Sequence, residues 1–404
     1  MLYSISKPFG VWFHTGATQE TGSPLDRGFL TFLLCVSLIV LLKRHFKWTE
    51  AIRNNPWLMV LLGYMLVSIL WSPMPTISFK RWMRELVAIA MAFLISSERN
   101  PHLAIKSIIR RTIYILLPFS LLLIKFYPAY GIQTAHWSGV IMWVGVTPQK
   151  NWLCLLCVIS AFFLIWVLRQ RWKGYDIAIT KYQIYIELFL LLLSFLLLGG
   201  PERTLTNSAT SLIAFVVGLL AFAALLWAKK KGVILKRNAL NIVVGFIIIY
   251  GTVTPFIGKL SFWDVSSVVG RNETLTGRTY IWSTLIPSAM SKPIIGHGMG
   301  GFWDTTTRKI APSAHNGYLD VILILGFLGL GLVFLFILSC SAKATMALAD
   351  DMDWGMLFIC YLLMLLVHNI TESSIVTFTG SLPAIILFFS VTSNKEHLTR
   401  SFTS

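Results

Sequence analysis

The sequence predicts an all-α protein that crosses a membrane many times, and three observations support this fold class. The 404 residues are 56% hydrophobic, with a mean hydropathy of +0.72. Only 13% of them are charged, about half of the roughly 25% that is usual in soluble domains. The apolar residues also form long runs, which is typical of transmembrane helices. This composition excludes a water-soluble globular enzyme, a disordered chain and a collagen-like fibre.

We expect about 11–12 transmembrane helices. Backbone groups in lipid are satisfied only in helices or closed barrels, and these runs are too long and unbroken for barrel strands. Eleven runs are visible, at 28–43, 57–71, 84–97, 107–127, 150–168, 183–199, 207–228, 238–257, 315–339, 355–370 and 379–392. A shorter apolar stretch at 137–146 predicts an interfacial or re-entrant segment.

The topology follows from the distribution of Lys and Arg. Basic groups stand in alternate connections, around 43–53, 99–111, 169–181 and 229–237, and basic connections are retained in the cytoplasm. The N-terminus then lies outside. It has no adequate apolar segment for a cleavable signal, so the first span would act as the insertion signal. A net charge of +17 can indicate nucleic-acid binding, but no basic domain lies outside the membrane, so we expect none.

The predicted organisation has four parts. Residues 1–257 form N-terminal transmembrane helices, 258–314 a large outer loop with amphipathic helices, 315–392 C-terminal transmembrane helices, and 393–404 a cytoplasmic tail. Loops as long as 258–314 are usually functional or disordered. The aromatic residues of this one, among them Trp263, Trp282 and Trp303, favour a partly helical cap on the membrane.

Several familiar chemistries are not indicated. The five cysteines lie in or beside apolar runs, where a role in packing is expected. The acidic run Asp350, Asp351 and Asp353 falls in a connection assigned to the cytoplasm and is interpreted as a solvated turn. No outer cluster has the spacing of metal ligands, and there is no P-loop or serine-nucleophile elbow.

The informative residues are cations on the outer face, which should contain few of them. An arginine fork makes two parallel hydrogen bonds to phosphate, so several such cations in one cleft would bind a diphosphate. The alternatives are that Lys80 and Arg81 only extend to lipid headgroups, and that Arg203 pairs with Glu202 on the surface. The residues concerned are Arg81, Arg84, Lys150 (with Asn151 beside it), Arg203 and Arg278.

His315 is the candidate proton acceptor. It lies where the outer loop meets an apolar helix, and a histidine exchanges protons near neutral pH. Asn316 adds a second polar group, and Tyr318 shares its helix face. The alternative is an interfacial histidine with a satisfied hydrogen bond. His297 lies among glycines in a turn, and His368 and Glu372 end another helix, where they could line the same cleft.

Six segments in this order resemble the O-antigen ligase and exopolysaccharide polymerase superfamily of bacterial inner membranes. The segments PQKN and GRTYIW are most similar to the polymerase branch typified by succinoglycan-type polymerases. The six are SILWSPMPTISFKRW (68–82), GVTPQKNWL (145–153), PERTLTNSATSL (201–212), LTGRTYIW (275–282), PIIGHGMGGFW (293–303) and SAHNGYLDVILILGFLGL (313–330).

The resemblance implies a metal-independent, inverting glycosyltransferase of the GT-C kind that needs no cofactor. Its donor is a saccharide on undecaprenyl diphosphate at the periplasmic face. The family's diphosphate-binding arginines correspond to Arg203 and Arg278, and its proposed base to His315. As further substrate contacts we expect Arg81, Arg84, Lys150, Asn151, Asn316, Tyr318 and His297. Members commonly have twelve helices, whereas the first looks missing or degraded here.

The predicted function is polymerisation of lipid-linked saccharide repeat units for exopolysaccharide or O-antigen synthesis, in a multi-pass protein of the inner membrane. The alternatives are an O-antigen ligase that transfers glycan to lipid A core and, from another class, a flippase or exporter of lipid-linked oligosaccharide. Expected partners are the lipid-linked donor and acceptor, membrane lipids, and chain-length and export proteins.

Overall fold

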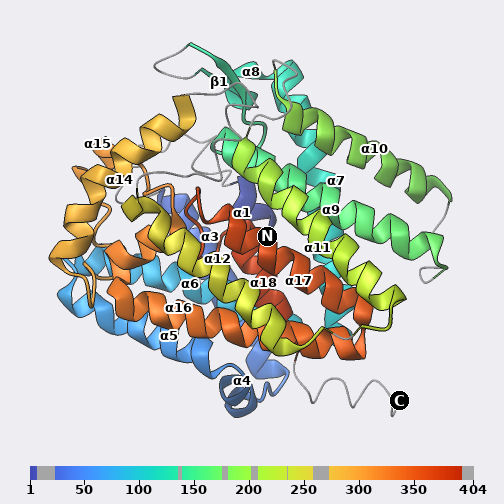
Figure 1. Cartoon of the computed structure of the whole chain (residues 1–404), viewed down its shortest axis with the longest axis horizontal. Coiled ribbons are helices and arrows are strands. Elements are labelled where there is room, and N and C mark those ends of the chain that lie inside the picture. Colours follow the sequence, from blue (N-terminus) through green and yellow to red (C-terminus); the bar gives the residue numbers. More distant parts are fainter. Residues whose placement is uncertain are drawn as a thin grey trace.

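Helices make up most of the computed structural model (Figure 1). It describes residues 1–6, 23–134, 139–174, 181–201, 208–233, 235–257 and 273–393. Five helices carry proline in their first turn, where its missing N–H and fixed φ angle favour helix initiation. Arg203, the first part of the loop at 258–314 and the tail from residue 394 lie outside the described residues.

The first half of the chain supplies α1 (Leu2–Ser6), α3 (Pro24–Lys43), α4 (Trp48–Asn54), α5 (Pro56–Val67), η1 (Ser68–Trp71), α6 (Pro75–Ser96), α7 (Pro101–Phe126), α8 (Pro128–Gly131), α9 (Lys150–Trp172) and α10 (Lys181–Gly199). The second half supplies α11 (Ala209–Lys230), α12 (Arg237–Ile257), α14 (Glu273–Ser291), α15 (Thr307–Ile310), α16 (Gly317–Asp350), α17 (Met352–His368) and α18 (Ser381–Thr392).

Each of the eleven expected spans coincides with helix, which confirms an all-α polytopic membrane protein. Among the described residues, seven helices are long and apolar enough to cross a membrane, or eight if the bent pair of α4 with α5 and η1 counts as one span. The other three expected spans are α6, which carries four charged residues, and the shorter apolar helices α17 and α18.

The apolar stretch at 137–146 differs from the expected interfacial or re-entrant segment. Its described part contains strand β2 (Ile141–Trp143), which pairs antiparallel with β1 (Ile132–Thr134) so that Ile132 faces Trp143. Ile and Trp favour strands, and Gly139 adopts a positive φ of 66° between them. A small hairpin therefore lies just before α9.

Side chains tie α9 to α17 at both ends. Every residue of α17 from Trp354 to His368 is buried. At one end the Asn151 amide donates to Glu372 (2.7 Å), and at the other Arg169 pairs with Asp353 (2.9 Å). Asn151 and Arg169 are 18 residues apart, or about 27 Å along a helix, close to the roughly 30 Å of a bilayer core. The two ends of this pair therefore lie near opposite membrane surfaces.

Helix α16 is broken at Gly326, which has φ 69° and ψ −173°. The segment 293–298 replaces the lost helical hydrogen bonds. His297 N–H donates to the Leu323 carbonyl (3.0 Å) and Gly298 N–H to that of Ile324 (2.9 Å). In return, Phe327 N–H donates to the Pro293 carbonyl (2.7 Å). Irregular backbone within a membrane protein requires such partners, so this segment and the break in α16 depend on each other.

We predict that Gly326→Ala lowers stability by about 1–3 kcal/mol, because a Cβ there would meet the Ile294 carbonyl and the backbone has a conformation restricted to glycine. Thermal unfolding of the purified protein measures this. The matched control is Gly331→Ala in the same helix, where a Cβ meets open space and stability should hold or rise slightly. Equal melting temperatures of the two variants would contradict a requirement for glycine at the break in α16.

Candidate active site

Glu372 is the centre of a polar cluster contributed by four segments. The chain leaves α17 at His368 and makes a further turn in which Glu372 N–H donates to the His368 carbonyl (3.0 Å). Oε1 of Glu372 accepts from Asn151 at the start of α9 (2.7 Å) and from Arg278 in α14 (3.0 Å). Oε2 lies 3.6 Å from Nδ1 of His315, just before α16. The cluster thus brings together three residues that the sequence analysis identified.

The cluster is mostly removed from solvent. The Glu372 side chain is 8% exposed, Arg278 17% and His315 21%. Burial alone would raise the pKa of Glu372, but the nearby His315, Arg278 and His368 outweigh it and the pKa is lowered. The carboxylate therefore stays ionised, with His315 Nδ1 3.6 Å away, just beyond hydrogen-bond distance. His368 itself is buried beside it.

The backbone of His315 is held in an uncommon conformation. Its φ is +48°, in the left-handed region, which costs a residue other than glycine roughly 1–3 kcal/mol. The following Asn316 fixes this turn. Its Oδ1 caps α16 by accepting from Leu319 N–H (2.8 Å), and its Nδ2 donates to the carbonyls of Gly251 and Ile370, each at 2.9 Å. Asn316 thereby joins α12, α16 and the segment after α17.

Tyr318 and His297 contact protein rather than open space. Tyr318 is fully buried, its hydroxyl donates to the Leu366 carbonyl (2.9 Å), and its ring lies against Gly251. His297 Nδ1 lies 3.0 Å from the Leu323 carbonyl oxygen at the break in α16. Burial lowers the His297 pKa and Lys292 adds to this, against the hydrogen bond to Leu323. Tyr318 and His297 hold helices and loop in place.

The remaining expected substrate contacts do not lie together in the structure. Arg81 donates to the carbonyls of Gly300 and Trp303, so it clamps the loop that fills the break in α16. Arg84 is exposed on α6. Lys150 adjoins Asn151 and is partly exposed beside the cluster. The Thr210 and Thr371 hydroxyls are 2.7 Å apart, which places the start of α11, soon after Arg203 in the chain, next to Glu372.

Glu372 is the principal residue that motif reasoning undervalued. From the sequence it is expected only to line the cleft, although an acidic residue four positions after an apolar helix usually indicates function or a buried ion pair. In the described part of the chain, no three His, Cys, Asp or Glu side chains are grouped so that they could hold a metal ion.

The fold and the cluster define a class: a polytopic membrane protein with an arginine, a carboxylate and a histidine gathered at one membrane surface. Residues 188–335, which include Arg278 and His315, match the family model described as O-antigen ligase. The exopolysaccharide production protein ExoQ of Rhizobium meliloti (strain 1021) is 25% identical over 256 residues, 61% of this chain and 52% of that protein. The chain thus spans about half the length of this relative. The expected resemblance to the O-antigen ligase and exopolysaccharide polymerase superfamily is confirmed.

We predict that Glu372→Gln lowers the free energy of unfolding by about 3–5 kcal/mol, because it leaves Arg278 buried without its counter-charge. Glu98→Gln is the matched control: it breaks an exposed pair with Arg44 and should cost less than about 1 kcal/mol. Thermal or denaturant unfolding in detergent compares the two. A Glu372→Gln protein as stable as the control would show that the contact between Glu372 and Arg278 does not stabilise the fold.

Acid should weaken the same contact. The folded-state pKa of Glu372 lies below its ordinary value of 4.5, so its ionised form stabilises the fold above that pH. This contribution is lost as the pH falls through the lowered folded value. We expect the melting temperature of the wild type to fall more steeply below about pH 4.5 than that of Glu372→Gln. If the melting temperatures of the two proteins fell in parallel with pH, ionised Glu372 would not stabilise the fold.

Proposed function

We propose that the chain is a glycosyltransferase that polymerises undecaprenyl-diphosphate-linked saccharide repeat units at the periplasmic face of a bacterial inner membrane. The observation that carries the proposal is the contact of Glu372 with both Arg278 and His315. It combines an oriented base with a phosphate-binding cation at one membrane surface. The end with Arg44, Arg99 and Arg169 would face the cytoplasm under the positive-inside rule.

The proposed reaction needs a base for the acceptor hydroxyl. Glu372 faces Nδ1 of His315, which favours the tautomer with its proton on Nδ1 and leaves the Nε2 lone pair free to accept. The acceptor oxygen then attacks C1 of the donor sugar while its proton passes to Nε2. The bond from C1 to the diphosphate oxygen breaks, and the diphosphate takes the electron pair. A general base of this kind typically raises the reaction rate by about 10²–10⁴-fold.

The leaving diphosphate needs positive charge where its own charge develops. Arg278 contacts Glu372 through Nη2. A guanidinium carries five N–H groups, so in this proposal the others donate to phosphate oxygens. In this proposal Lys150 and Arg203 add charge, and Asn316, Tyr318 and Arg81 support the site by positioning its backbone. The mechanism needs neither a metal ion nor a cofactor and inverts the anomeric centre, as expected from the resemblance.

An O-antigen ligase is the second candidate, because residues 188–335 match a model with that description. The name of the ExoQ relative concerns exopolysaccharide production, which favours the polymerase. Both reactions use the same donor chemistry and the same site. They differ in the acceptor, which is another lipid-linked saccharide for a polymerase and lipid A core for a ligase.

We predict that His315→Ala abolishes polymer formation in cells without reducing the amount of protein in the membrane. His315→Asn should do the same although asparagine tolerates a left-handed φ, which separates loss of the base from backbone strain. His45→Ala is the control, since His45 also has a positive φ (49°) but lies near Arg44. Polymer output at the wild-type level in either His315 variant would exclude His315 as the base.

We predict that Arg278→Lys reduces polymer formation at least tenfold, because one ammonium cannot replace a planar fork. Arg44→Lys changes a partly exposed arginine in a comparable pair with Glu98 and should have little effect. Gel profiles of polymer from cells with equal protein levels give the comparison. Full activity of Arg278→Lys would mean that a single positive charge suffices there.

A further inference from the structure

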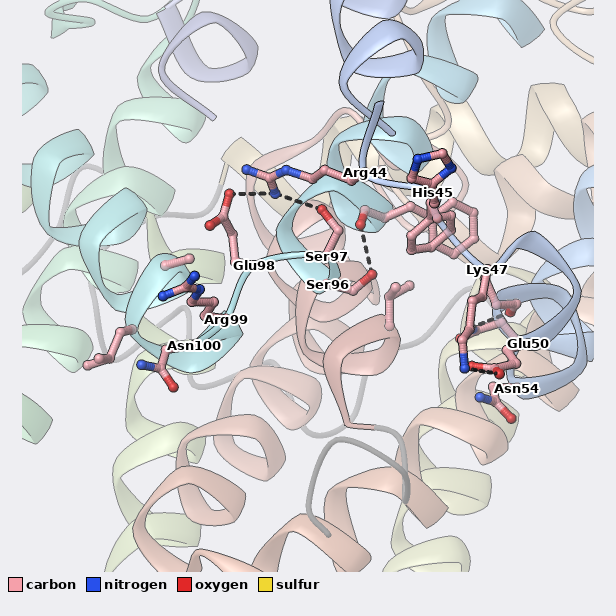
Figure 2. Close-up of a pocket in the computed structure, with 17 residues that line it drawn as sticks. Arg44, His45, Lys47, Glu50, Asn54, Ser96, Ser97, Glu98, Arg99 and Asn100 are labelled. Atoms are coloured by element: carbon pink, nitrogen blue, oxygen red, sulfur yellow. Dashed lines mark hydrogen bonds and ion pairs between the residues drawn. The ribbon is translucent and has the colours of Figure 1, made fainter. Parts of the chain in front are cut away.

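A polar cavity lies at the opposite end of the protein from Glu372. Its volume is about 880 Å³ (Figure 2). Its walls are the ends of α3 and α6, the start of α7, and α4, with Val391 of α18. Figure 2 shows Glu98, Arg99 and Asn100 on one side of the cavity, and Lys47, Glu50 and Asn54 on the other. The proposed reaction uses none of these residues.

The cavity lies at the level of a membrane surface. Helix α4 meets the following spanning segment at 94°, so it runs along the surface while α5 crosses the membrane. Trp48 at the start of α4 packs edge-on against Phe46 and Phe93, with ring centroids 5.1 and 6.2 Å away. Tryptophan is enriched at this depth in membrane proteins. The cavity therefore opens among lipid headgroups.

The charge around the cavity is positive. Arg44 pairs with Glu98 (2.9 Å) and Lys47 with Glu50 (2.7 Å), so these four charges cancel. Arg99 is exposed, and no carboxylate contact of its guanidinium is found among the described residues. Behind the wall, the buried Lys343 donates to Oδ1 of Asn55, which lines the cavity, at 2.6 Å. Arg99 and Lys343 thus give the cavity an excess of positive charge.

The rim of the cavity is apolar where α7 begins. Leu103 lines the cavity there and is 59% exposed. A free phosphate would leave this side chain in water. A phospholipid would cover it with its acyl chains while its headgroup entered the cavity, which combines the two kinds of contact that lipid binding to proteins uses.

We propose that this cavity binds the anionic headgroup of a phospholipid in the leaflet at that end of the protein, with Arg99 as the main contact to the phosphodiester. Arg44 and Lys47 remain within the same cavity as further cations. The inference concerns a site about one membrane thickness from Glu372 and is independent of the proposed glycosyl transfer.

The test is retention of phosphatidylglycerol by the purified full-length protein in native mass spectrometry. We expect selective retention over phosphatidylcholine, and a loss of about fivefold in Arg99→Gln, as for one basic residue near an anionic surface. Arg237→Gln is the matched control. Arg237 is also an exposed arginine at the start of a helix, but it lies outside the cavity, so retention should stay within about twofold of the wild type.

Two further measurements and one further variant make the outcome decisive. Circular dichroism shows whether Arg99→Gln is folded, and Leu103→Ser tests the apolar rim without changing charge, with an expected loss of retention. Competition with glycerol 1-phosphate separates a lipid site from a free phosphate site. Equal losses in Arg99→Gln and Arg237→Gln, no preference for phosphatidylglycerol, or full displacement by equimolar glycerol 1-phosphate would overturn the proposal.

Discussion

The burial of the Glu372 carboxylate is the constraint on which the rest of the structure depends. An isolated ion out of water costs several kcal/mol, so a carboxylate at the end of the buried α17 requires partners. Arg278 and Asn151 provide them from α14 and α9, and His315 faces the other oxygen from the start of α16. Satisfying one charge therefore fixes where four segments meet, and it places His315 and Arg278 on the two oxygens of one carboxylate.

The same helices keep the two charged ends apart. Because α9 and α17 are tied at Glu372 and again at Asp353, their polar contacts lie about one bilayer core from each other. The core between them is apolar, and its irregular element is the break at Gly326. The loop that repairs this break also holds Trp303 through Arg81. The packing at the break in α16 is thus linked to α6, which carries Arg81.

Much of this could be predicted from the sequence, because long apolar runs and alternating basic groups are direct consequences of the bilayer. Arg278 stands out because outer loops of such proteins contain few basic residues, and His315 because it lies where the outer loop meets an apolar helix. Partners could not be predicted in the same way: Arg81, Asn316 and Tyr318 are suited to phosphate or sugar, yet they bond backbone carbonyls that only the fold brings near. The three glycines of residues 326–331 could not be ranked from the sequence either. The one that breaks α16 is set by the approach of residues 293–298.

The central claim is that the cluster around Glu372 transfers glycosyl groups from a lipid diphosphate. The most direct measurement uses the purified protein in nanodiscs with a lipid-linked repeat unit and no other enzyme. The account predicts longer lipid-linked glycans together with released undecaprenyl diphosphate for the wild type, and neither for His315→Ala. Transfer only after lipid A core is added would make the protein a ligase with the same site. With an intact donor, the absence of both reactions would contradict the assignment to glycosyl transfer.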